Sequence, residues 1–352
     1  METTTCFYVA VCVLVACLSN VQAAGWDYLN DSGKGPDTWE ASYDTCGGSK
    51  QSPINIETAM VEEKDLGDFT FVGFGEDDKP VNATMTVSNN GHSVVVGVDG
   101  DYHVSGAGLG TTAYKAVQFH FHWGSVNSQG SEHTIDGKAY PGELHIVCYN
   151  TSYPNFFSAL FNEDGLTVLG FFLEIQTVDN PALTQLFDVI SSIQFDEEEE
   201  DLSMPVVFNN FLPSDLSSYY RYSGSLTTPP CYEIVTWNVF TEPIMVSEAQ
   251  LNALRRQYAN KHNAADNITL TDTYRPVQPV NNRTVYMTDP NAVTDHMTTL
   301  SPNQDNINTE NVNTPTPSYV NTPTPSSAPC QFASTSLVAL VISKVLASVL
   351  DD

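Results

Sequence analysis

A strand with two histidines on one face is predicted by the run Gln118-Phe119-His120-Phe121-His122-Trp123-Gly124. Side chains of a β-strand point to opposite faces in turn, so residues two apart in this run share a face. His120 and His122 therefore lie side by side with Gln118. Two imidazoles on one rigid strand are half of a metal site. This run therefore predicts both a β-sheet and the position of a metal site on that sheet.

A second alternating run, 143–147, offers a third imidazole in His145. The Gly-, Ser- and Pro-containing connection lets this run return antiparallel beside the first. Three neutral imidazoles on neighbouring strands hold zinc tetrahedrally and leave one position for water. Gln118 and Glu143 each precede a histidine by two residues, so we expect them to hold His120 and His145 by hydrogen bonds. A lone His-x-His pair is more often two half-buried polar residues than a metal site. The presence of His145, Gln118 and Glu143 favours the metal site here.

Further motifs follow in order along the chain. They are SKQSPINI at 49–56, NNGH at 89–92, GSEH at 130–133, GLTVLG at 165–170, GSLTTPPC at 224–231 and YRPVQP at 274–279. With the histidine runs, they make the chain from about Trp26 to Met287 resemble an α-class carbonic anhydrase of the secreted or GPI-anchored type. The resemblance implies an α+β, predominantly β fold. We expect a single domain with a large, twisted, mostly antiparallel central sheet and short peripheral helices.

The resemblance implies Zn²⁺ held by His120, His122 and His145. It also implies zinc-dependent reversible hydration of CO₂ to bicarbonate and a proton, by attack of zinc-bound hydroxide. Thr227 matches the residue that orients this hydroxide, and Glu132 would accept a hydrogen bond from the Thr227 hydroxyl. Taken alone, both would be ordinary loop residues.

The resemblance also assigns residues around the reacting atoms. The expected CO₂ pocket consists of Val147, Val168, Leu226, Thr228 and Trp237. His92 matches the proton shuttle, because an imidazole titrates near neutral pH and can pass protons to buffer. Tyr28 and Asn90 match positions that order the connecting waters, whereas Val95 stands where relatives often have a polar residue. The alternatives are plain core packing for the apolar residues and a solvated surface position for His92.

Residues 1–23 are predicted to be a signal peptide, because an apolar run at 6–18 precedes small residues and is too short to span a membrane. No Lys or Arg precedes the run, which departs from the usual pattern. In a secreted protein, the resemblance implies a disulfide between Cys46 and Cys231, and Cys148 is expected to be a buried free thiol. The Asn-x-Ser/Thr candidates for N-glycosylation are Asn30, Asn82, Asn150, Asn267 and Asn282.

The domain boundaries follow from composition. We expect a catalytic domain at 24–288, a Thr/Pro/Asn-rich stalk at 289–328 and an apolar C-terminal tail at 329–352 that resembles a GPI-attachment signal. The expected location is extracellular, with the protein secreted or held by a GPI lipid on the outer membrane face, and the expected role is extracellular pH and inorganic-carbon handling. Lys344 weakens the GPI signal, so a free secreted protein is the alternative.

The net charge of −29, from 42 acidic and 13 basic residues, excludes a nucleic-acid partner because phosphate would be repelled. The acidic run 196–201 is interpreted as a solvated loop or helix end, with weak Ca²⁺ or mineral binding as the alternative. Two rival functions stay open: a binding module on the same fold that has lost catalysis, and an acidic matrix protein. Oligomeric state is left undetermined.

Periodicity predicts strands at 85–88, 93–98, 102–104, 116–123, 143–149, 166–176 and 231–240. It predicts one clear helix at 247–258, with Ser247 capping its start.

Overall fold

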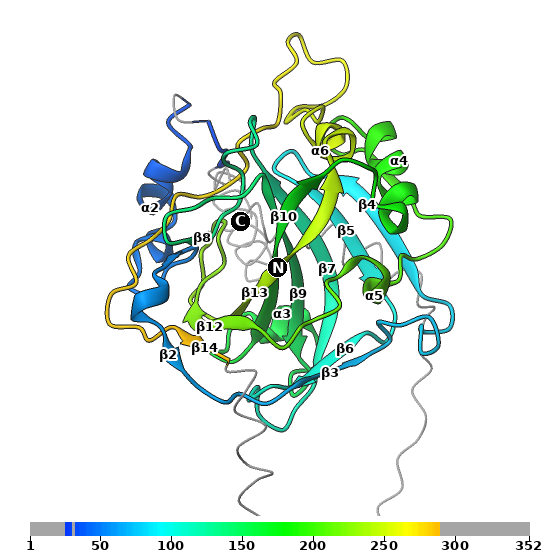
Figure 1. Ribbon diagram of the computed structural model, residues 1–352. Helices are drawn as coiled ribbons and strands as arrows, with labels where there is room; N and C mark the ends of the chain where they lie inside the picture. The colour runs from blue at the N-terminus through cyan, green and yellow to red at the C-terminus, as the bar shows by residue number, and fades with distance from the viewer. Residues whose placement is uncertain (1–24, 30–31, 289–352) are drawn as a thin grey trace, which may run out of the picture.

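One large twisted sheet dominates the computed structural model, which describes residues 25–29 and 32–288 (Figure 1). The predicted signal peptide, stalk and tail, and Asn30, lie outside these residues. Within the described ranges, no helix has the length and apolar character needed to cross a membrane.

The main sheet has 12 strands and runs β11-β4-β5-β7-β9-β10-β13-β12-β14-β2, with β6 joining β3 to β7. Its strands are β2 (Glu62–Glu63), β3 (Phe69–Val72), β4 (Thr84–Asn89), β5 (Val94–Asp99), β6 (His103–Gly106), β7 (Tyr114–Trp123), β9 (Gly142–Asn150), β10 (Leu166–Gln176), β11 (Glu199–Asp201), β12 (Tyr219–Gly224), β13 (Val235–Ser247) and β14 (Tyr286–Met287). Neighbours are antiparallel except for the pairs β10/β13 and β14/β2. The predicted architecture, predominantly β with a mostly antiparallel sheet, is therefore confirmed. A small parallel pair, β1 (Asn55–Ile56) with β8 (Thr134–Ile135), lies apart from it.

The helices are short and peripheral, as predicted. They are α2 (Trp39–Ser42), α3 (Phe156–Ala159), α4 (Thr184–Ser192), α5 (Phe208–Phe211) and α6 (Glu248–Leu254), with 3-10 turns η1 (Pro36–Thr38), η2 (Asp44–Gly47), η3 (Thr58–Met60) and η4 (Pro181–Leu183). Ser247 caps α6 in a capping box with Gln250, although the helix ends at Leu254, before the predicted Tyr258. The sequence reading missed α4, which lies next to α6 (Figure 1).

The central strands are buried on both faces, and alternation divides their side chains between two apolar clusters. In β9, Leu144, Ile146 and Cys148 join the larger cluster, which also contains Leu186 and Ile190 of α4. Val147 of the same strand belongs to the smaller cluster on the opposite face, together with Val168 and Trp237. The odd-numbered residues of β9, including His145, therefore point toward this second face.

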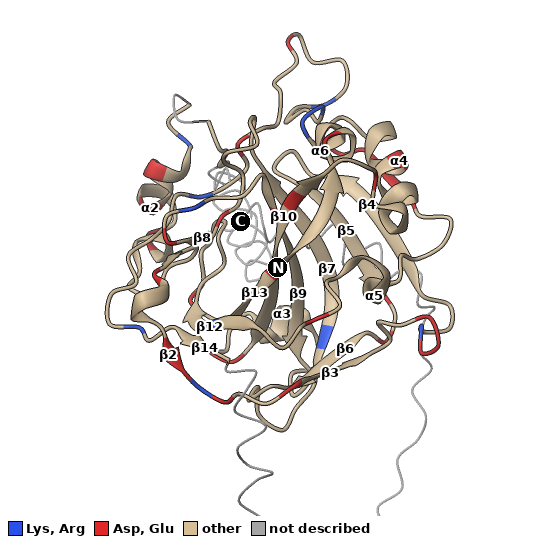
Figure 2. Cartoon of the chain, in the orientation of Figure 1, with Lys and Arg blue, Asp and Glu red and all other residues tan. Residues whose placement is uncertain are grey.

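Acidic residues occur at many places along the ribbon, and basic residues at few (Figure 2). The prediction of a loop or helix end for the acidic run is wrong for Glu199–Asp201, which forms strand β11 against β4. All three residues of β11 are exposed, so the strand completes the backbone hydrogen bonds of β4 while its carboxylates stay in water.

Candidate active site

The sheet brings together the three predicted histidines, His120 and His122 of β7 and His145 of β9, hereafter the histidine triad. The antiparallel register places His120 directly opposite His145. Ring nitrogens of the three lie within 4.8 Å of one another. Two short sequence motifs, whose nearest histidines His122 and His145 are 23 residues apart, are thus joined into one cluster by strand pairing.

Each ring of the triad uses one nitrogen in a hydrogen bond to an acceptor. His120 Nδ1 lies 2.8 Å from Gln118 Oε1, and His145 Nε2 lies 2.7 Å from Glu143 Oε1. His122 Nδ1 lies 2.6 Å from the backbone carbonyl oxygen of Thr273, a partner that sequence reasoning missed. Since all three partners are acceptors, each ring donates there and keeps a lone pair on its other nitrogen.

The free nitrogens of the triad have the character of metal ligands. His122 Nε2 is buried and has no hydrogen-bond partner within the described part of the chain. Burial lowers the pKa of His122 and holds the pKa of His120 well below its ordinary value, and the neighbouring histidines lower both further. Both rings are therefore neutral at physiological pH, the form in which imidazole binds metal.

The Glu143 carboxylate accepts four hydrogen bonds and so connects the triad to the neighbouring residues. Its Oε1 lies 2.7 Å from His145 Nε2 and 2.7 Å from His133 Nδ1, and its Oε2 accepts from the backbone N–H groups of Glu132 and His133 at 2.9 and 2.8 Å. Burial alone would raise the pKa of Glu143, but the histidines and their hydrogen bonds hold it well below its usual range. The carboxylate stays charged and fixes both rings.

Glu132 reaches the triad from the chain segment before β8. Its Oε1 accepts from the backbone N–H of Arg275 at 2.9 Å. Its Oε2 is buried, lies 3.3 Å from His122 Nε2 and has no hydrogen-bond partner among residues 25–29 and 32–288. Thr227 is buried on the loop after β12, and the structure records no hydrogen bond between its hydroxyl and Glu132 in these ranges.

The predicted pocket residues form a row across three strands. Val168 of β10 pairs with Val147 of β9 and with Trp237 of β13. All three are buried, Leu226 packs against the same cluster, and the Trp237 ring lies edge-on to His145 with 4.7 Å between centroids. Thr228 is half-buried on the same loop as Leu226. The apolar surface is thus contiguous with the triad.

His92 lies in the turn between β4 and β5, where its ring stacks on Trp26 with 3.9 Å between centroids and 12° between planes. Sequence reasoning missed this contact, because Trp26 belongs to none of the motifs. Asn90 Oδ1 accepts from the backbone N–H groups of His92 and Ser93 at 3.0 and 2.8 Å, and so shapes this turn. Tyr28 packs edge-on to Trp26. Burial raises the pKa of the Tyr28 phenol, and the Glu132 carboxylate raises it further.

Comparison with known proteins identifies the family. A profile of eukaryotic-type carbonic anhydrases matches residues 34–289. The chain belongs to this family. It is 34% identical over 272 residues to human carbonic anhydrase 12, covering 76% of this chain and 73% of that protein. It is 36% identical over 269 residues to carbonic anhydrase 3 from Sus scrofa, covering 75% of this chain and 98% of that protein. The predicted enzyme class, a lyase that hydrates CO₂, is confirmed.

The loop that follows Thr227 in this carbonic anhydrase is anchored covalently. Cys46 and Cys231 form the expected disulfide, which closes a sequence separation of 185 residues. Arg275 Nη2 donates to the Cys46 carbonyl oxygen at 2.8 Å, and Gln51 Nε2 donates to that of Cys231 at 3.2 Å. Cys148 is buried and forms no disulfide within residues 25–29 and 32–288, and burial raises its pKa, so its thiol is unreactive.

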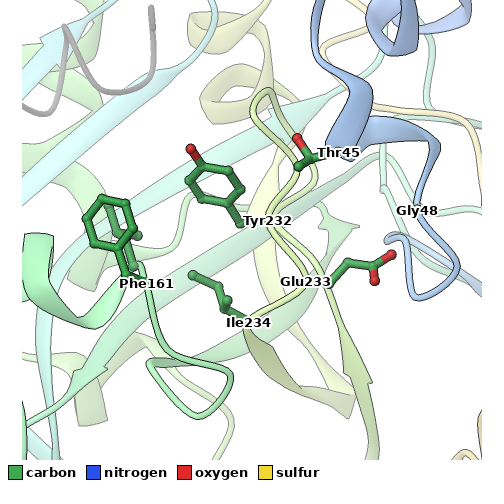
Figure 3. Close-up of a pocket in the computed structure, with 7 residues that line it drawn as sticks. Thr45, Gly48, Phe161, Tyr232, Glu233 and Ile234 are labelled. Atoms are coloured by element: carbon green, nitrogen blue, oxygen red, sulfur yellow. The ribbon is translucent and has the colours of Figure 1, made fainter.

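A hollow of about 410 Å³ lies beside this disulfide-bonded loop of the carbonic anhydrase (Figure 3). Its lining includes Phe161, Tyr232 and Glu233 and none of the triad. The hollow is therefore distinct from the site built by the three histidines.

The glycosylation candidates differ in exposure. Asn82, Asn267 and Asn282 are exposed. Asn150 is buried, and its Nδ2 donates to the backbone carbonyl and the carboxylate of Asp164 at 3.3 and 3.1 Å. The structure therefore argues against Asn150 as a glycan acceptor, because its amide nitrogen is enclosed and already used.

Proposed function

We propose that this carbonic anhydrase is a zinc enzyme in which His120, His122 and His145 hold the metal. The observation that carries the proposal is the buried Nε2 of His122, which has no hydrogen-bond partner among the described residues and belongs to a cluster of ring nitrogens within 4.8 Å. A buried polar nitrogen without a partner is costly unless something else binds it. Three neutral imidazoles suit Zn²⁺, and a three-ligand set leaves a position open for water.

When bound, Zn²⁺ supplies hydroxide near neutral pH by lowering the pKa of water to about 7, a value known for carbonic anhydrases as a class. Glu132 and Thr227 would orient the nucleophile. Glu132 Oε2 is buried, has no hydrogen-bond partner in the part of the chain that the structure describes, and is available to accept from the Thr227 hydroxyl. A threonine that donates to Glu132 presents its own oxygen as an acceptor, and its backbone N–H can face the oxygen that gains charge.

The apolar row would bind CO₂. Carbon dioxide has no net dipole, so it gains from leaving water for the surface formed by Val147, Val168, Leu226 and Trp237. Because Trp237 also packs on the His145 ring, this surface ends at the triad. Thr228 completes the pocket on its polar side.

His92 would carry the released proton to solvent. Its ring stacks on Trp26 and is only half-buried, so it can exchange protons with buffer. Tyr28 and Asn90 would order the connecting waters, and the raised pKa of Tyr28 keeps its hydroxyl protonated and able to donate to water. The role of Asn90 is to fix the turn through its contacts with the backbone of His92.

Stopped-flow CO₂ hydration with zinc content measured on the same sample tests this proposal. We expect His92→Ala to slow turnover in weak buffer, and added imidazole to restore it, while KM for CO₂ stays unchanged. His103→Ala is a matched control, because His103 lies in β6 on the far side of β7 from the triad strand β9. A His92→Ala enzyme with full rate in weak buffer would refute the shuttle.

We further propose that the enzyme acts outside the cell in pH and inorganic-carbon handling. The Cys46–Cys231 disulfide supports this location, since such bonds persist in oxidising compartments. Three exposed glycosylation candidates agree with it. Release of hydration activity from intact cells by a phosphatidylinositol-specific phospholipase would support the GPI lipid, and activity found only in the medium would contradict it.

A further inference from the structure

Asp196 lies beside the turn that carries His92, and the proposed reaction gives it no role. A Cβ built on Gly91 would lie 3.1 Å from Asp196 Oδ1. Gly91 has a φ of +79°, a left-handed conformation that favours glycine. The carboxylate of Asp196 therefore packs directly against the residue that precedes His92.

Asp196 is held in this place by backbone hydrogen bonds. Its N–H donates to the Asn260 carbonyl oxygen at 3.2 Å, and the next N–H, of Glu197, donates to the Asn89 carbonyl oxygen at 2.9 Å. The buried Asn89 amide donates to the Gln194 carbonyl oxygen at 3.1 Å. The segment that carries Asp196 is thus tied to the end of β4, two residues before Gly91.

Among the described residues, Glu197, Lys261 and His92 are the charged groups that act on Asp196. Burial raises the pKa of the half-buried Asp196 carboxyl, and Glu197 raises it further, while Lys261 and His92 lower it. The Lys261 Nζ lies 2.5 Å from Glu197 Oε1, so Lys261 forms its ion pair with Glu197. His92 is thus one of the charged groups that act on the Asp196 carboxylate.

We propose that Asp196 is a positioning residue for proton transfer, which stabilises the imidazolium of His92 in its place against Trp26. This inference rests on the shuttle role proposed above. The face of an indole ring attracts a cation, so Trp26 and Asp196 act in the same direction. Together they retain the proton on His92 until buffer removes it.

The test compares Asp196→Asn with wild type by two readouts. One is the ¹H NMR titration of the His92 C2 proton, assigned with His92→Ala. The other is the pH profile of CO₂ hydration in weak buffer. We expect both midpoints to move to lower pH in Asp196→Asn by about half a unit, as for a partly exposed ion pair. The shift should shrink in about 1 M salt, where screening is strong.

Glu199→Gln is the matched control, because it removes the same charge from the exposed strand β11 of the same acidic run. It should move the His92 titration by less than a third of that shift. An unchanged His92 titration in Asp196→Asn, or an equal shift in Glu199→Gln, would overturn the inference. Failure of the shuttle proposal is seen separately, as a full weak-buffer rate in His92→Ala.

Discussion

Replacing Glu143 with glutamine is expected to destabilise the protein strongly, because one buried carboxylate serves four donors. Two ring N–H groups, of His133 and His145, meet Oε1, and two backbone N–H groups meet Oε2. Glutamine keeps one acceptor oxygen and replaces the other with an NH₂ group. Whichever way the amide turns, two buried donors face a donor.

The expected loss of stability follows from the two buried donors that lose their acceptor. A buried donor left without its acceptor costs about 1–3 kcal/mol, so Glu143→Gln should lower the free energy of unfolding by about 4 kcal/mol at pH 7. The folded pKa of Glu143 is depressed, so this stability is present above the unfolded value of about 4.3 and is lost as pH falls through the folded pKa. The difference in the free energy of unfolding between wild type and Glu143→Gln should therefore become smaller at acid pH.

Urea unfolding of the metal-free proteins, followed by tryptophan fluorescence at pH 7 and at about pH 3, measures this effect. Glu62→Gln is the control, because Glu62 is exposed on β2 and should change stability by less than about 0.5 kcal/mol. A loss below about 1 kcal/mol for Glu143→Gln at pH 7 would refute the reasoning about the four donors.

Three further substitutions test other parts of the structure. Replacing Cys46 and Cys231 with serine should cost about 3–5 kcal/mol in urea unfolding, because the bond closes a separation of 185 residues, and equal stability of wild type with and without reductant would contradict this. Gly170→Ala should weaken zinc affinity in chelator competition, since the new Cβ would lie 3.2 Å from Glu143 Oε1; an unchanged affinity would count against it. Ser247→Ala should lower Tm and cost about 1 kcal/mol through loss of the α6 cap, whereas no change would show that the cap is dispensable.

The strands that could be predicted from the sequence are those with clear alternation. The strands β7, β9 and β10 lie within two residues of their predicted bounds. The predicted strand 231–240 begins only at Val235, because the disulfide holds Cys231 in a loop. The sequence reading missed α4, whose Thr, Phe, Val and Ile content disfavours a helix; burial of Leu186 and Ile190 stabilises it instead.

The candidate site could be predicted where side chains follow a motif. Gln118 and Glu143 hold their histidines as spacing suggested, because strand geometry fixes which residues share a face. The Thr273 carbonyl could not be found this way, since every residue offers a carbonyl and only the fold selects one. Trp26 stacks on His92 and Asp196 packs against Gly91, both from segments distant in sequence, so no local pattern marks them.

Zinc stoichiometry after dialysis tests most directly the claim that three imidazoles form the metal site. We predict about one zinc per chain in the wild type and none in His122→Ala, with loss of CO₂ hydration in the same sample. His133→Ala is a poor control because His133 also contacts Glu143, whereas exposed His262→Ala should bind zinc normally. A His122→Ala protein that retained a full equivalent of zinc and its hydration rate would contradict the assignment.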